Sequence, residues 1–209
     1  MIDVSRQLSA VRRQVGRRVL EAGEVRVVTI AQTYDASVED VWEACTSAER
    51  LPRWFLPVTG DLHVGGRYQL VGNAGGTIER CDPPHVLAAT WEHGGNVSWI
   101  ELRLTAEDDE RTRWELDHLF PLDDPKWEEF GPGAVGVGWD LALPGLASHL
   151  ATRAPVDRDA GMAWVASDEG RRFIALSSRA WRDANVAAGA DGAAADAAEQ
   201  RTTAAYAGM

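Results

Sequence analysis

The sequence predicts an α+β fold, in which an antiparallel sheet of about six strands is followed by a long helix. Residues 24–34 (EVRVVTIAQTY) are rich in β-branched side chains and predict the first strand. Turn sequences such as GNAGG, DPPH and HGGN divide the middle of the chain into further strands. Because no helical segment separates these strands, antiparallel pairing is expected. They are predicted at about 61–71, 76–82, 86–93, 97–105 and 111–120.

Two short helices are expected between the first strand and this meander. Ser37 precedes the helical pattern VEDVWEAC and is followed three positions later by an acid, which is the arrangement of a capping box. A second short helix is expected from Ala48 to Phe55, ending near Pro57.

A long helix is expected from Asp124 to about Thr152. Its apolar residues recur at helical intervals at Trp139, Leu143, Leu146 and Leu150. Gly131 is expected to cap this helix and Pro132 to occupy its first position. Pro144 lies well inside the segment and is expected to kink or break the helix.

Four glycines, at positions 131, 133, 136 and 138, fall in the first half of this helix. Each glycine lowers the stability of a helix by up to about 1 kcal/mol relative to alanine. The presence of four glycines in this helix therefore has to be explained by what surrounds them. Two interpretations remain open. Either the helix packs very tightly on the sheet with no void, or it leaves room for a ligand opposite an aromatic wall of the sheet.

The chain is expected to divide into four parts, 1–23, 24–155, 156–188 and 189–209. The first part has apolar residues at helical spacing with five arginines between them, and it predicts a basic amphipathic helix. The second part is the α+β domain. The third part predicts a helix capped by Ser167 with one apolar face, made of Phe173, Leu176, Ala180, Trp181 and Ala184. The alanine-rich last part predicts a weak helix or a tail.

Composition excludes several classes of function. The 209-residue chain has a net charge of −11, and an acidic surface repels phosphate backbones, so no nucleic-acid partner is expected. Two cysteines far apart in sequence indicate reduced thiols in a cytoplasmic protein, and no apolar run is long enough for a membrane span. The five histidines lack metal-ligand spacing and no nucleotide-binding motif is present, so neither a metal nor a cofactor is expected.

Five blocks of the sequence resemble those of the START-like (SRPBCC) superfamily, in the order found in its helix-grip domains. They are ASVEDVWEACTSAERLPRWF, DLHVGGRYQL, GGTIERCDPPHVLAATWE, TRWELDHLF and GWDLALPGLASHL. Within this superfamily the chain most resembles homologues of the activator of the 90-kilodalton heat-shock protein ATPase, over about residues 25–152. The resemblance implies a curved sheet wrapped around the long C-terminal helix, with extra N- and C-terminal helices as additions.

The resemblance also implies a cavity between the concave face of the sheet and the long helix. Side chains alternate along a strand, so the apolar positions of each strand are expected to face inward together. The expected ligand-binding residues are Trp54, Phe55, Tyr68, Trp91, Trp114, Leu116 and His118, with Val135, Trp139 and Leu143 on the helix. Large aromatic side chains with few polar groups favour a small apolar or aromatic ligand.

Two other functions remain open. A polyketide-cyclase or dehydratase-like enzyme would use His118, which as an imidazole titrates near neutral pH, together with Glu79 as a buried acid. A co-chaperone-like or regulatory protein would instead bind a partner protein on an exposed surface. The terminal helices offer such a surface, and a homodimer through the N- or C-terminal helices is a further expectation.

Overall fold

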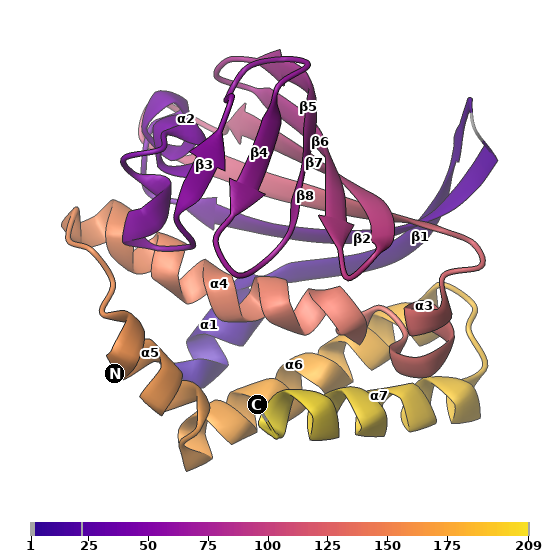
Figure 1. Ribbon diagram of the computed structural model, residues 1–209. Helices are drawn as coiled ribbons and strands as arrows, with labels where there is room; N and C mark the ends of the chain where they lie inside the picture. The colour runs from indigo at the N-terminus through magenta and orange to yellow at the C-terminus, as the bar shows by residue number, and fades with distance from the viewer. Residues whose placement is uncertain (1–2, 22, 209) are drawn as a thin grey trace. The chain divides into compact units, whose positions relative to one another are not determined.

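The strands of the chain form one sheet in a computed structural model that describes residues 3–21 and 23–208 (Figure 1). The sheet has eight strands in the order β1-β2-β8-β7-β6-β5-β4-β3. From β3 to β8, each strand pairs antiparallel with the next in sequence. The strands are β1 (Arg12–Leu20), β2 (Gly23–Tyr34), β3 (Val58–Gly60), β4 (Arg67–Leu70), β5 (Gly75–Asp82), β6 (Val86–His93), β7 (Asn96–Ala106) and β8 (Thr112–Pro121). The α+β class and the antiparallel meander are therefore confirmed.

The strand count is higher than expected for two reasons. The predicted strand at 61–71 is two short strands, β3 and β4, which are separated by a turn in which Gly65 has a φ of 83°. Such a positive φ suits glycine and interrupts an extended chain. The other additional strand is β1, which comes from the N-terminal segment.

The prediction of one amphipathic helix over residues 1–23 is wrong. Helix α1 covers only Val4–Ala10 with Asp3 as its N-cap, and Arg12–Leu20 form β1 instead. Residues four apart share a face in a strand as well as in a helix, so the spacing of Val11, Val15 and Val19 did not discriminate between the two. β-branched valines and Gly16 both lower helix propensity, which favours the strand.

The long helical segment contains two helices rather than one. Asp124 caps α3 (Pro125–Phe130), and its carboxylate accepts hydrogen bonds from the backbone N–H groups of Lys126 and Trp127. Gly131, expected to cap the long helix, instead ends α3 with a φ of 59°. Helix α4 then runs over Gly133–Thr152. It continues past Pro144, since complete or nearly complete burial of Leu146 and Leu150 offsets the missing backbone hydrogen bond.

The other helices follow the predicted order with different lengths. Ser37 caps α2 (Val38–Thr46) as expected, while the second short helix is only a 3₁₀ turn, η1 (Leu51–Arg53). The C-terminal extension contains α5 (Arg158–Val165), α6 (Asp168–Ala187) and α7 (Gly192–Ala207). Ser167 caps α6 as predicted, but Leu176 is 38% exposed, and Ile174 and Ser177 belong to the buried face instead. Among the described residues, no helix combines the length and apolar character needed to cross a bilayer.

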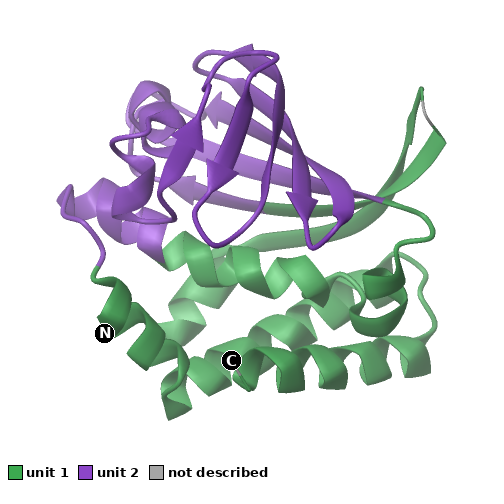
Figure 2. Ribbon diagram, viewed as in Figure 1, with its two compact units in different colours: residues 1–30, 121–144, 157–209 green, residues 31–120, 145–156 purple. Residues whose placement is uncertain are grey.

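The chain divides into two compact units, which Figure 2 colours separately. Unit 1 comprises residues 1–30, 121–144 and 157–209, and unit 2 comprises residues 31–120 and 145–156. Strand β2 and helix α4 contribute residues to both units. The division does not follow the four sequential parts predicted from composition, because segments far apart in sequence form each unit.

The glycines of α4 face the C-terminal helices of unit 1. A Cβ atom on Gly136 would lie 2.3 Å from the indole of Trp181, and one on Gly133 would lie 2.8 Å from Thr202. Gly138 faces the hydroxyl of Tyr206, which donates a hydrogen bond to the carbonyl of Ala134. Both interpretations of these glycines, tight packing on the sheet and room for a ligand opposite the sheet, are therefore wrong. The glycines instead allow α6 and α7 to pack closely against α4.

Candidate functional site

The inner face of the sheet in unit 2 carries a cluster of aromatic side chains around a buried histidine. His118 on β8 is only 1% exposed. It stacks on Phe120 with ring centroids 4.4 Å apart, and Trp91 on β6 meets it edge-on at 5.7 Å. Phe120 and His118 are two positions apart on one strand, so they share a face of the sheet. The structure therefore brings Trp91 and His118 together.

His118 is held as a neutral imidazole. The Ser98 hydroxyl donates to the carbonyl of Trp91 at 3.1 Å, so its oxygen accepts from His118 Nε2 at 2.9 Å. Burial lowers the pKa of His118 to about 3. An imidazole that stays neutral from pH 4 upward does not exchange protons near neutral pH, so the buried ring is a polar but uncharged part of this face.

A second part of the same face is an apolar cluster centred on Tyr68, Leu70, Ile78 and Ala89, all buried. The Tyr68 hydroxyl donates to the carbonyl of Thr90 at 2.7 Å, and burial raises the pKa of this phenol. Eight apolar side chains pack against the cluster but keep part of their surface exposed. These are Leu51, Phe55, Leu56, Val58, Cys81, Leu87, Trp91 and Ile100.

Trp54 and Phe55 differ in role although their rings stack at 5.4 Å. Trp54 is buried and its indole donates to the carbonyl of Ala44 at 2.8 Å, which anchors η1 to α2. A Cβ atom on Gly145 would lie 2.8 Å from the carbonyl oxygen of Trp54, so this glycine permits a close approach. Phe55 packs on the apolar cluster and remains partly exposed.

The remaining predicted residues lie in different places. Trp114 and Leu116 are buried on β8, on the same face as His118. Val135, Trp139 and Leu143 lie on α4 in unit 1, where Trp139 and Leu143 are buried. Their part in ligand binding stays a prediction. Glu79 is exposed where the register of β5 against β6 shifts, so the expectation of a buried acid at this position is wrong.

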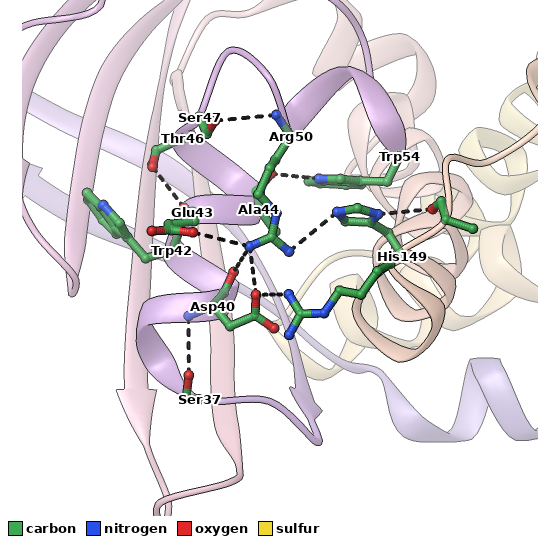
Figure 3. Close-up of polar contacts among 12 residues, drawn as sticks. Ser37, Asp40, Trp42, Glu43, Ala44, Thr46, Ser47, Arg50, Trp54 and His149 are labelled. Carbon is green, nitrogen blue, oxygen red and sulfur yellow. Dashed lines mark hydrogen bonds and ion pairs between the residues drawn. The ribbon is translucent and has the colours of Figure 1, made fainter.

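A charged cluster in unit 2 was missed at the level of sequence (Figure 3). Asp40 on α2 accepts from Arg50 at 2.6 Å and also pairs with Arg153, which follows the end of α4. Arg50 contacts Nε2 of the buried His149 at 3.4 Å, and His149 Nδ1 lies 3.0 Å from the carbonyl of Ala154. Partial burial raises the pKa of Asp40, but the hydrogen bonds from Arg153 and Arg50 outweigh burial and lower the net pKa.

This charged cluster fixes structure rather than offering a free site. Its members are tied to one another by the contacts that Figure 3 draws, and the cluster joins α2, the segment before η1 and the end of α4. Only the three-dimensional fold brings Asp40 and His149 together, because they are more than a hundred positions apart. Within residues 3–21 and 23–208, no group of three or more His, Cys, Asp or Glu side chains is arranged to hold a metal ion.

A buried ion pair of unit 1 was also missed. Asp140 on α4 accepts from Arg13 at 2.8 and 3.0 Å, from Ser177 at 2.6 Å and from the indole of Trp181 at 2.8 Å. The remaining guanidinium nitrogen of Arg13 donates to the carbonyls of Leu8 and Val11. Through these hydrogen bonds the ion pair connects β1, α4 and α6.

Comparison with known proteins agrees with this architecture. The family model described as Activator of Hsp90 ATPase homolog 1-like protein matches residues 35–151. The crystal structure of CalU16 from Micromonospora echinospora is 38% identical, with a TM-score of 0.68, and the match covers 84% of this chain and 98% of CalU16. The solution structure of CalU16 is 37% identical, with a TM-score of 0.72, over 86% of this chain and 97% of that one.

A more distant match shows the fold alone. DynU16, a protein of the dynemicin biosynthetic locus, is 22% identical with a TM-score of 0.53, and the match covers 62% of this chain and 48% of DynU16. None of the curated proteins matches the chain. The family match spans more than half of the chain and includes α2, β3 to β8 and most of α4. The chain belongs to the family of Activator of Hsp90 ATPase homolog 1-like proteins, within the START-like helix-grip superfamily.

Proposed function

We propose that this chain binds a small apolar or aromatic molecule on the inner face of the sheet in unit 2. The observation that carries the proposal is the partial exposure of eight apolar side chains around the buried Tyr68 cluster. A fully packed core leaves no such surface open, and an apolar surface left open near the interior favours an apolar occupant.

The polar groups of this face favour an uncharged ligand. The Tyr68 hydroxyl is already bonded to a backbone carbonyl, and His118 is neutral and bonded to Ser98. No charge on either residue would compensate a charged ligand, and burying an unpaired charge costs far more than burying an aromatic ring. The ring of Trp91 supplies an aromatic surface for stacking or edge contacts.

An enzymatic function receives less support from the same geometry. General acid–base catalysis needs a group whose pKa lies near the working pH, and the pKa of His118 is about 3. Glu79 is exposed on β5. Binding without chemistry therefore accounts for the described residues more simply than a cyclase or dehydratase reaction.

The test of this proposal is native mass spectrometry of the freshly purified full chain, followed by denaturation and mass analysis of the released material. We expect a small molecule in stoichiometric amount, lost on denaturation, with lower occupancy in Trp91→Ala. A matched control is Trp164→Ala, since Trp164 is a partly buried tryptophan on α5 in unit 1. An empty native spectrum, together with no binding of added fluorene or 9-fluorenone, would contradict the proposal.

A further inference from the structure

Two buried hydrogen-bond donors in unit 2 lie close to the same cysteine. Tyr34, at the end of β2, is 5% exposed, and Trp114 on β8 is 2% exposed. Both interact with Cys45 of α2, whose thiol pKa burial raises to about 12 while the indole of Trp114 opposes the rise. Strands β2 and β8 are neighbours in the sheet, and the Thr112 hydroxyl of β8 donates to the carbonyl of Ala36 just beyond the end of β2. The buried phenol and indole therefore lie near each other, beside the partly buried Cys45.

Neither aromatic donor finds a proper acceptor. Within the described chain, the Tyr34 hydroxyl and Trp114 Nε1 are buried without a hydrogen-bond partner. The Cys45 sulfur beside Trp114 is at best a weak acceptor. Leaving one buried donor unsatisfied costs about 1–3 kcal/mol, so two in one place call for an explanation.

Other buried aromatic donors of this protein do have partners. Tyr68 donates to Thr90 and Trp54 donates to Ala44 in unit 2. In unit 1, Trp181 donates to Asp140 and Tyr206 donates to Ala134. Tyr34 and Trp114 depart from this pattern at one and the same location, which points to an acceptor supplied from outside the chain.

The location connects with the face proposed to bind a ligand. Trp114, Leu116 and His118 alternate along β8 and share its inner face. Four residues of strand separate the indole of Trp114 from the imidazole of His118 by roughly 13 Å along the strand axis. Leu116 lies between Trp114 and His118 on this face and is 3% exposed, so a polycyclic molecule would reach the two donors from the aromatic cluster only where the Leu116 side chain moves aside.

We propose that Tyr34 and Trp114 donate hydrogen bonds to a carbonyl oxygen of the bound molecule, which is therefore a neutral aromatic ketone or quinone rather than a plain hydrocarbon. This inference rests on the proposed function and adds the chemical class of the ligand. A carboxylate fits less well. The nearby cation, Arg50, is already paired with Asp40, and the donors themselves are uncharged.

The test compares two probes of one skeleton, 9-fluorenone, which carries the carbonyl, and fluorene, which lacks it. Equilibrium dialysis against the full chain measures both affinities. We expect the wild type to bind 9-fluorenone roughly fivefold to tenfold more tightly than fluorene, since a neutral hydrogen bond contributes about 1 kcal/mol. Tyr34→Phe and Trp114→Phe should each lower this preference at least twofold, measured as the ratio of the two affinities in the same variant.

Tyr206→Phe is the matched control, because its hydroxyl is partly buried and already bonded to Ala134 in unit 1. It should leave the preference intact. Equal affinity of the wild type for the two probes, or a preference that survives in both Tyr34→Phe and Trp114→Phe, would overturn the inference. Either result would leave the proposed function standing, because fluorene itself would still bind. Failure of both probes to bind, together with an empty native mass spectrum, would overturn the proposed function as well.

Discussion

In unit 2, Trp91 keeps part of its surface exposed beside a buried histidine, whereas in unit 1 the ring of Trp181 is completely buried against Gly136. The indole N–H of Trp181 is bonded to Asp140, and the glycines of α4 leave no space next to it. The apolar side chains around Tyr68 remain partly open. Trp91 and Trp181 therefore have different surroundings, one partly exposed and one completely buried, and substitutions should separate their roles.

The largest expected effect is on the buried ion pair of unit 1. Asp140→Asn should lower the free energy of unfolding by about 3–5 kcal/mol, because Arg13 would keep a buried charge without its counter-charge. Urea unfolding followed by circular dichroism measures the change. The control is Glu24→Gln, which removes the exposed partner of Arg17 and should cost less than about 1 kcal/mol. Equal losses in the two variants would contradict the structural role of Asp140.

The next effect tests the closeness of helix packing. Gly136→Ala should destabilise the protein by about 1–3 kcal/mol, since its Cβ would overlap the ring of Trp181. Gly161→Ala on α5 is the control, because no atom lies within 4 Å of the added methyl group. There alanine should stabilise the helix by up to about 1 kcal/mol. Thermal unfolding of both variants gives the comparison, and a stabilising Gly136→Ala would show that the helices are not in close contact.

The free energy of unfolding should depend on pH through His118 in unit 2. The pKa of His118 is about 3 in the folded protein and about 6.5 in an unfolded chain, so between these values only the unfolded chain takes up the proton. Stability should therefore fall as the pH falls from 6.5 toward 3, by up to about 1.4 kcal/mol per pH unit.

His118→Gln, which keeps a donor for Ser98, should remove this part of the pH dependence. Urea unfolding at pH 7, 6 and 5 measures the slope for the wild type and the variant. His63→Gln, at an exposed histidine, is the control and should leave the slope unchanged. Identical slopes for the wild type and His118→Gln would mean that His118 is not held neutral by burial.

The smallest expected effect is on ligand affinity. Trp91→Ala should weaken the binding of fluorene about tenfold, or about 1.4 kcal/mol, because it removes an aromatic surface from the proposed site. Trp164→Ala should leave this affinity unchanged. Equilibrium dialysis measures both, and an undiminished affinity of Trp91→Ala would place the ligand elsewhere.

Much of the fold was predictable because local patterns were unambiguous. Turn sequences gave the meander, Ser37 and Ser167 marked helix starts, and alternation correctly grouped Trp114, Leu116 and His118 on one face. The helix predicted for the N-terminal segment was wrong because apolar residues four positions apart share one face in a strand as well as in a helix. The alanine-rich tail has little periodicity of its own, yet it forms α7, with Thr202 and Tyr206 bonded to carbonyls of residues 130 and 134.

The site was less predictable, because the face of the sheet to which a side chain points does not determine which residues that side chain contacts. The glycines of α4 suggested contact with the sheet or a ligand, but their neighbours are Trp181, Thr202 and Tyr206 of the C-terminal helices, which no local pattern identifies. The neutral state of His118 depends on Ser98, twenty positions away on the adjacent strand. The unpartnered donors of Tyr34 and Trp114 carry no sequence signal at all, since both residues look like ordinary core positions.

The most direct test of ligand binding in unit 2 uses the indole N–H signals of the nine tryptophans as reporters. Two-dimensional nitrogen–proton NMR spectra of the labelled full chain would be recorded during titration with 9-fluorenone, after assignment by single Trp→Phe variants. We predict that the signals of Trp91 and Trp114 shift with saturation at one equivalent, while that of Trp181 stays in place. Shifts confined to Trp164 and Trp181, or no shift at any tryptophan, would contradict the proposed site.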